Sequence, residues 1–106
     1  MYWYSRFWIG PSIKEKKWII CKRIQYNKLQ RGIYVLTLAS NKNNIIDIYP
    51  SYVLLQPYYK RQKLIVVGIA KGYEEAINLV KDIIEHIYKE TGSVNVRDYI
   101  IKEIGE

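Results

Sequence analysis

The segment 73–90 constrains the fold more than any other part of this chain, because its apolar residues recur at helical spacing. They would form one stripe along a helix, made of Tyr73, Ala76, Ile77, Val80, Ile83, Ile84 and Ile87. Such a stripe must be buried against another layer of structure. The pattern therefore predicts a long amphipathic helix that ends before Gly92, with Val80 and Ile84 buried against a sheet.

The preceding residues are expected to supply that sheet. Four segments are rich in the β-branched and aromatic residues typical of strands, namely 17–24, 33–39, 45–49 and 64–70. Segment 2–9 is predicted as an edge strand. Pro50 interrupts the pattern, so residues 51–56 are either a strand past a bulge or a short helical turn.

A short C-terminal helix is predicted over residues 96–104, with Asn95 as its N-cap and an inward face of Ile100, Ile101 and Ile104. The predicted fold is α+β: an antiparallel β-meander of four to five strands, one long amphipathic helix packed on one face, and this short helix. One helix cannot cover both faces of a sheet. The second face is therefore expected to be open to solvent or to a ligand.

The length of 106 residues predicts a single α+β domain spanning 1–106. No apolar run approaches the 18 or so residues of a membrane span, so no transmembrane segment is expected. Cys21 is the only cysteine, and it lies in an apolar run. We expect a buried, reduced thiol and a small soluble protein of the cytoplasm.

Charge is divided unevenly along the chain. Residues 1–63 hold twelve of the seventeen Lys and Arg residues and only two acids, a net charge of +10, whereas residues 64–106 have a net charge of −3. Twelve of the fifteen aromatic residues also lie in the first part. A basic, aromatic surface of this kind is typical of proteins that meet an anionic partner.

Two stretches combine cations with rings in the way that single-stranded nucleic acid requires, since bases stack on rings and phosphates pair with cations. The residues expected to contact nucleic acid or another anion are Tyr58, Tyr59, Lys60, Arg61, Lys63, Lys22, Arg23 and Arg31. Similar residues recur throughout 14–31. The alternative for segment 58–63 is a solvated loop whose Tyr rings pack on the sheet.

The dense aromatic cluster at the N-terminus indicates a protein interface, because Tyr and Trp are enriched at interface hot spots. Its residues are Tyr2, Trp3, Tyr4, Phe7 and Trp8. A homodimer formed through this edge is one hypothesis. The alternative is that the rings pack in the core beneath an edge strand.

Signatures of catalysis are weak in this sequence. His86 has no second His or Cys nearby, and the glycine-rich turn 66–75 does not match a phosphate-binding loop. We expect no metal, no cofactor and no enzymatic activity. The leading interpretation is a non-enzymatic binding or protein-interaction module that self-associates. The alternative is a nucleic-acid-binding module that uses the basic, aromatic-rich N-terminal half.

Overall fold

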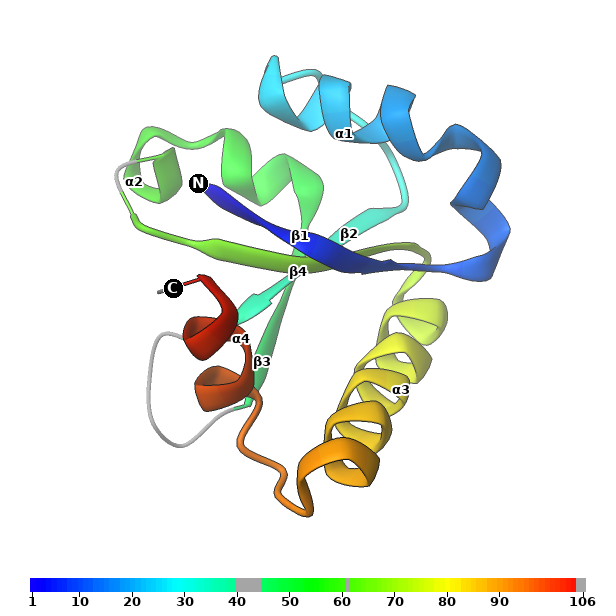
Figure 1. Ribbon diagram of the computed structural model, residues 1–106. Coiled ribbons are helices and arrows are strands. Elements are labelled where there is room, and N and C mark those ends of the chain that lie inside the picture. The colour runs from blue at the N-terminus through cyan, green and yellow to red at the C-terminus, as the bar shows by residue number, and fades with distance from the viewer. Residues whose placement is uncertain (40–44, 61, 105–106) are drawn as a thin grey trace.

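The computed structural model describes residues 1–39, 45–60 and 62–104, which form a mixed four-stranded sheet between two helical layers (Figure 1). The strands are β1 (Tyr2–Ile9), β2 (Ile33–Leu38), β3 (Ile46–Pro50) and β4 (Ile65–Lys71). The α-helices are α1 (Lys17–Gln25), α2 (Pro57–Lys60), α3 (Tyr73–Thr91) and α4 (Val96–Ile104). Two 3-10 helices are η1 (Pro11–Lys16) and η2 (Ser51–Leu55).

The predicted α+β class is confirmed, but the antiparallel meander is wrong. The strand order is β1-β4-β2-β3, and β1 pairs parallel with β4 while the other pairs are antiparallel. β1 lies at an edge, as predicted, and β4 is central. A hairpin turn cannot join parallel neighbours, which need longer connections. Here η1 and α1 carry the chain away from β1 before β2 begins.

The segment 17–24, predicted as a strand, is helix α1. Its buried residues Ile20, Cys21 and Ile24 are spaced as one helical face, and tertiary packing overrides their strand preference. The helix ends with Asn27 in the left-handed region, at φ 59°. The Lys28 amide donates to the Arg23 carbonyl at 2.8 Å, and the Asn27 amide donates to Ile24, which together form a Schellman cap.

The face of the sheet that was expected to be open is covered, because η1, α1 and η2 pack on it. They contribute Ile13, Ile20 and Leu54 to a core that also contains Val35 and Val66 from the sheet. Figure 1 shows α1 and α2 on one side of the sheet and α3 and α4 on the other. The sequence left two alternatives for residues 51–56, a strand past a bulge or a short helical turn. Residues 51–55 form the 3-10 helix η2.

Two polar links hold this layer together. The buried Gln30 side chain donates from Nε2 to the carbonyl of Ile20 at 3.3 Å. The Ser51 hydroxyl donates to the carbonyl of Gln30 at 3.2 Å. Since Gln30 lies between α1 and β2, these bonds fix η2 beside α1 with no charged group involved.

The predicted long helix is confirmed as α3, with Gly92 in the left-handed region at its C-terminal end. The buried face differs from the expected one. Leu79, Ile83 and Ile87 are fully buried against the sheet, whereas Val80 and Ile84 are half-buried. The sheet therefore contacts one side of the apolar stripe rather than its centre.

The predicted cap of α4 is also confirmed. The Asp98 amide donates to Asn95 Oδ1 at 3.1 Å, and the Asn95 amide group donates to Asp98 Oδ2 at 2.9 Å. Ile100 is buried as predicted, but Ile101 and Ile104 are exposed, so the inward face of α4 is narrower than expected.

Helix α4 is joined to β1 through Tyr4. The buried Tyr4 hydroxyl donates to Glu103 Oε2 at 2.6 Å, and Arg6 pairs with the same carboxylate. Burial, followed by the hydrogen bond to Glu103, raises the pKa of Tyr4 to about 12. The neutral phenol is therefore the form that the folded protein stabilises.

Tyr4 should make stability fall at high pH. A raised pKa contributes stability that is complete below the unfolded value near 10 and is lost as pH rises toward 12. We expect a loss of about 2–3 kcal/mol, since each pKa unit is worth about 1.4 kcal/mol. Urea unfolding of Tyr4→Phe between pH 9 and 12 should show a flatter decline than the native protein, while the exposed control Tyr2→Phe should not. Identical declines for Tyr4→Phe and native protein would contradict this assignment.

Candidate nucleic-acid interface

The two helical layers carry opposite charge. Residues 11–32, which include η1 and α1, contain seven basic residues and one acid, Glu15, a net charge of +6. Residues 72–104, which include α3 and α4, contain four basic and seven acidic residues, a net charge of −3. Because these layers lie on opposite sides of the sheet (Figure 1), the charge division of the sequence becomes a division between two faces.

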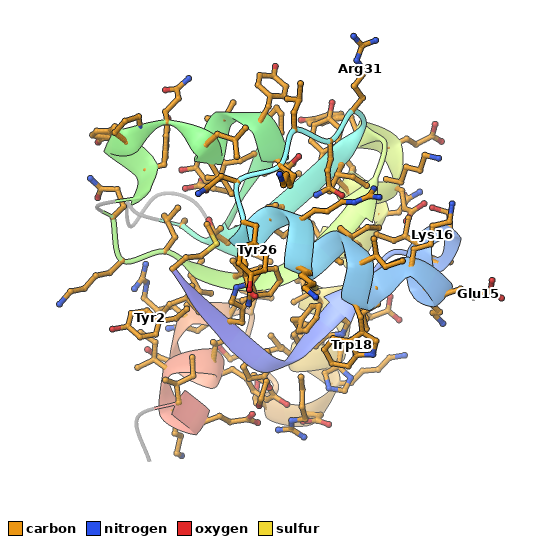
Figure 2. All side chains as sticks on the ribbon, turned by 90° about the horizontal axis from the view of Figure 1, so that it is seen from above. Tyr2, Glu15, Lys16, Trp18, Tyr26 and Arg31 are labelled. Carbon is orange, nitrogen blue, oxygen red and sulfur yellow. The ribbon has the colours of Figure 1, made fainter. Side chains whose placement is uncertain are left out.

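The outer side of α1 presents rings and cations at successive turns. Trp18, Lys22 and Tyr26 are spaced four residues apart, so they follow one another along the helix surface. Trp18 is 73% exposed and Tyr26 is 65% exposed. Figure 2 looks down on this layer and labels Trp18 and Tyr26 toward the two ends of α1. Single exposed rings are ordinary on a protein surface, so it is the spacing of these two rings with Lys22 that distinguishes this stripe.

A hollow of about 270 Å³ lies beside this stripe. It is lined by Ile19, Lys22, Arg23, Tyr26 and Lys28. Its floor is mostly apolar and its rim carries three cations. Among the residues that the structure describes, none of these cations forms an ion pair, so their charges are available to an anionic ligand.

Lys17 adds a fourth cation at the start of the stripe. Its Nζ lies 4.6 Å from the centre of the Trp18 ring and 5.2 Å from that of Phe7. These cation–π contacts hold the ammonium group against one face of Trp18. The arrangement places a positive charge next to a ring whose remaining surface is open.

The predicted contact residues divide between several places. Lys22 and Arg23 belong to the α1 surface, whereas Arg31 projects away from it at the far side of the layer (Figure 2). Lys63 is exposed beyond α2. The side chain of Lys60 and the whole of Arg61 lie outside the described residues.

The two Tyr residues of α2 behave differently. Tyr58 is 57% exposed and available for stacking. Tyr59 is half-buried and packs edge-on against Tyr49, with ring centroids 5.4 Å apart. Tyr59 thus follows the alternative in which the ring packs on the sheet, while Tyr58 does not.

The N-terminal aromatic residues are mostly taken up by packing within the chain. Tyr4 is buried, and Trp3, Phe7 and Trp8 are half-buried against the two cores. Only Tyr2, at 59% exposure, is mainly open to solvent. A dimer formed through β1 stays a prediction, and Tyr2 is the ring most available to it.

Trp18 and Tyr26 belong to the rings and cations that recur throughout 14–31, but they were not among the expected contact residues. The signal that identifies them is their spacing with Lys22, combined with Asn27 as a helix-ending residue. When residues 17–25 are read as a helix, Trp18, Lys22 and Tyr26 follow one another along one side of it.

The glycine-rich turn before α3 is already occupied by a side chain of the protein. The Glu75 carboxylate accepts a hydrogen bond from the Ser12 hydroxyl at 2.5 Å and lies against Gly10. A second carboxylate, Glu74, is in the same helical turn. These negative charges disfavour a bound phosphate there, while Gly68 permits close approach of Trp8 and Leu79 to β4.

Cys21 and His86 lie on opposite sides of the sheet and form no dyad. Cys21 is buried beneath α1, where burial raises the pKa of its thiol. His86 is on the outer part of α3, 3.3 Å from a Glu90 carboxylate oxygen. Within residues 1–39, 45–60 and 62–104, no group of three or more His, Cys, Asp or Glu side chains is arranged to hold a metal ion.

Comparison with known proteins gives no functional assignment. No protein-family model, no curated protein and no solved structure matches this chain. Among the described residues, no helix combines the length and apolar character needed to cross a bilayer. The chemistry of the α1 surface is therefore the main guide to function.

Proposed function

We propose that this protein is a non-catalytic module that binds single-stranded nucleic acid through the outer surface of α1. The observation that supports the proposal most is the Trp18–Lys22–Tyr26 stripe, in which exposed rings alternate with a cation. Arg23 and Lys28 flank the stripe on a layer whose net charge is +6. The stripe and its neighbours thus offer rings on which bases can stack and cations that can pair with phosphates, the two contacts that hold a single strand.

Each part of the stripe has a distinct physical task. The Trp18 and Tyr26 rings stack on bases, a contact worth about 1–3 kcal/mol per base. Lys22, Arg23 and Lys28 pair with phosphates and release counterions from the strand. Because α1 is anchored by its buried face and its Schellman cap, the rings and cations are held on a fixed frame.

Single strands fit this surface better than duplexes do. Base faces are available to aromatic rings only where the bases are unstacked, as in single-stranded segments. The two rings lie on the outside of a helix whose opposite side is packed on the sheet. A strand that runs along α1 would contact rings and cations in turn.

Removing two cations tests the electrostatic part of the proposal. Binding of fluorescein-labelled oligo-dT is followed by anisotropy over a range of salt concentrations. Lys22→Ala combined with Arg23→Ala should reduce the log-log salt slope by about 1.4, because each lost phosphate contact removes about 0.7. The matched control is Lys81→Ala with Lys102→Ala, which removes two exposed cations from the acidic layer and should leave the slope unchanged.

Two results would contradict the proposal. One is the absence of measurable binding by the native protein at low salt. The other is an equal change in slope for the α1 pair and the control pair, which would indicate that net charge alone drives binding.

A further inference from the structure

A second hollow lies on the other side of the last turn of α1. Its volume is about 310 Å³, and it is lined by Met1, Trp3, Ile24, Gln25, Asn27 and Leu54. These residues come from the start of β1, the end of α1 and η2. The hollow thus opens where three elements that are distant in sequence meet.

The walls of this hollow are suited to a flat ring. Ile24 and Leu54 are buried and Trp3 is half-buried, which gives apolar surface around the opening. Trp3 is held in place by edge-on packing against Phe7, with ring centroids 5.3 Å apart. A volume near the lower limit of ligand sites favours one small ring system over a larger molecule.

Two carboxamides stand at the rim with their hydrogen-bonding groups free. The side chains of Gln25 and Asn27 are exposed, and neither makes a hydrogen bond within the part of the chain that the structure describes. Asn27 is fixed by its place in the Schellman cap, with φ 59°. Each carboxamide offers a donor and an acceptor side by side.

The two hollows are lined by interleaved residues at the end of α1 and just beyond it. Lys22, Arg23, Tyr26 and Lys28 line the basic hollow, while Ile24, Gln25 and Asn27 line the second one. A nucleotide whose phosphate pairs with these cations therefore lies close to the second hollow, which offers both apolar surface and carboxamides. Phosphate contacts position a strand, and base contacts select it.

We propose that the second hollow recognises one adenine base of the bound strand, an inference that rests on the proposed function. The base lies against Trp3, and the carboxamides of Gln25 and Asn27 pair with its edge. Adenine presents the donor N6 beside the acceptor N7, which a carboxamide matches with two hydrogen bonds, and its two fused rings cover more of Trp3 than the single ring of thymine does. The corresponding edge of guanine presents two acceptors, which suits Arg or Lys instead.

The test compares labelled oligo-dA with oligo-dT on the native protein and on Gln25→Ala combined with Asn27→Ala. The native protein should bind oligo-dA about tenfold more tightly, as expected for one carboxamide–adenine pair. The variant should bind the two strands with affinities that are equal within about twofold. Its salt slope should stay at the native value, because no cation is changed.

A second measurement keeps the test independent of the folding of the variant. Side-chain amide NMR signals of Gln25 and Asn27 in the native protein should shift on addition of oligo-dA and should shift less with oligo-dT. Equal affinity of the native protein for both strands, with a normal salt slope, would overturn adenine recognition alone. Failure of the native protein to bind either strand would overturn the proposed function as well.

Discussion

Replacing Ile83 by alanine should lower the free energy of unfolding by about 2–5 kcal/mol, the cost of deleting a fully buried aliphatic side chain and leaving a cavity. Ile83 is completely buried between α3 and the sheet, where it packs in one core with Leu36, Val67 and Ile100. These three neighbours are fully buried as well, so the lost contacts lie inside the core. Urea unfolding followed by circular dichroism measures the loss.

Two neighbouring substitutions provide the controls for Ile83→Ala. Ile84→Ala should cost less, because Ile84 is only half-buried, and Asp82→Ala should change the free energy of unfolding by less than about 0.5 kcal/mol. A cost for Ile84→Ala that equals or exceeds that of Ile83→Ala would contradict the observed orientation of α3.

The orientation of α3 shows which features of a helix hydrophobic periodicity can predict and which it cannot. The existence, type and C-terminal end of this helix are predictable because its stripe is long and Gly92 follows it. The apolar arc is wider than the surface that the sheet covers, since Ile77, Val80 and Ile84 remain half-buried. Which part of the arc faces inward depends on how β1 and α4 pack beside the helix, and periodicity within one segment carries no such information.

The misassigned segment 17–24 has a different cause. Its four consecutive apolar residues, 18–21, suit a buried strand as well as a helix, and β-branched residues favour the strand. The strand order decides between strand and helix, because β4 lies between β1 and β2. Once that position is filled, the segment packs across the sheet as a helix and turns Trp18 outward.

The candidate interface was predictable in its charge but not in its geometry. Counting cations along the chain identifies the basic part, and folding keeps residues 11–32 on one face. Individual members were less predictable, since Tyr59 packs against Tyr49 and Arg31 projects from the far side of the layer. A count of aromatic residues cannot distinguish an exposed ring from one that is buried in the core.

Replacing Tyr26 by alanine should weaken binding to oligo-dT by about tenfold, because stacking on one ring is worth about 1–3 kcal/mol. Trp18→Ala should weaken it at least as much, since Trp18 is 73% exposed and presents a larger ring. Neither change should alter the salt slope, because stacking on a ring releases no counterions. Anisotropy titrations at several salt concentrations separate these two quantities.

Tyr88→Ala is the matched control for Tyr26→Ala. Tyr88 is 57% exposed, close to the 65% of Tyr26, but it belongs to α3 in the acidic layer on the opposite side of the sheet. Its removal should leave the affinity for oligo-dT unchanged, and circular dichroism should show that both variants keep the native fold. Equal loss of affinity in Tyr26→Ala and Tyr88→Ala would contradict binding along α1. A loss confined to Tyr26→Ala and Trp18→Ala, at constant salt slope, separates ring stacking from attraction by net charge.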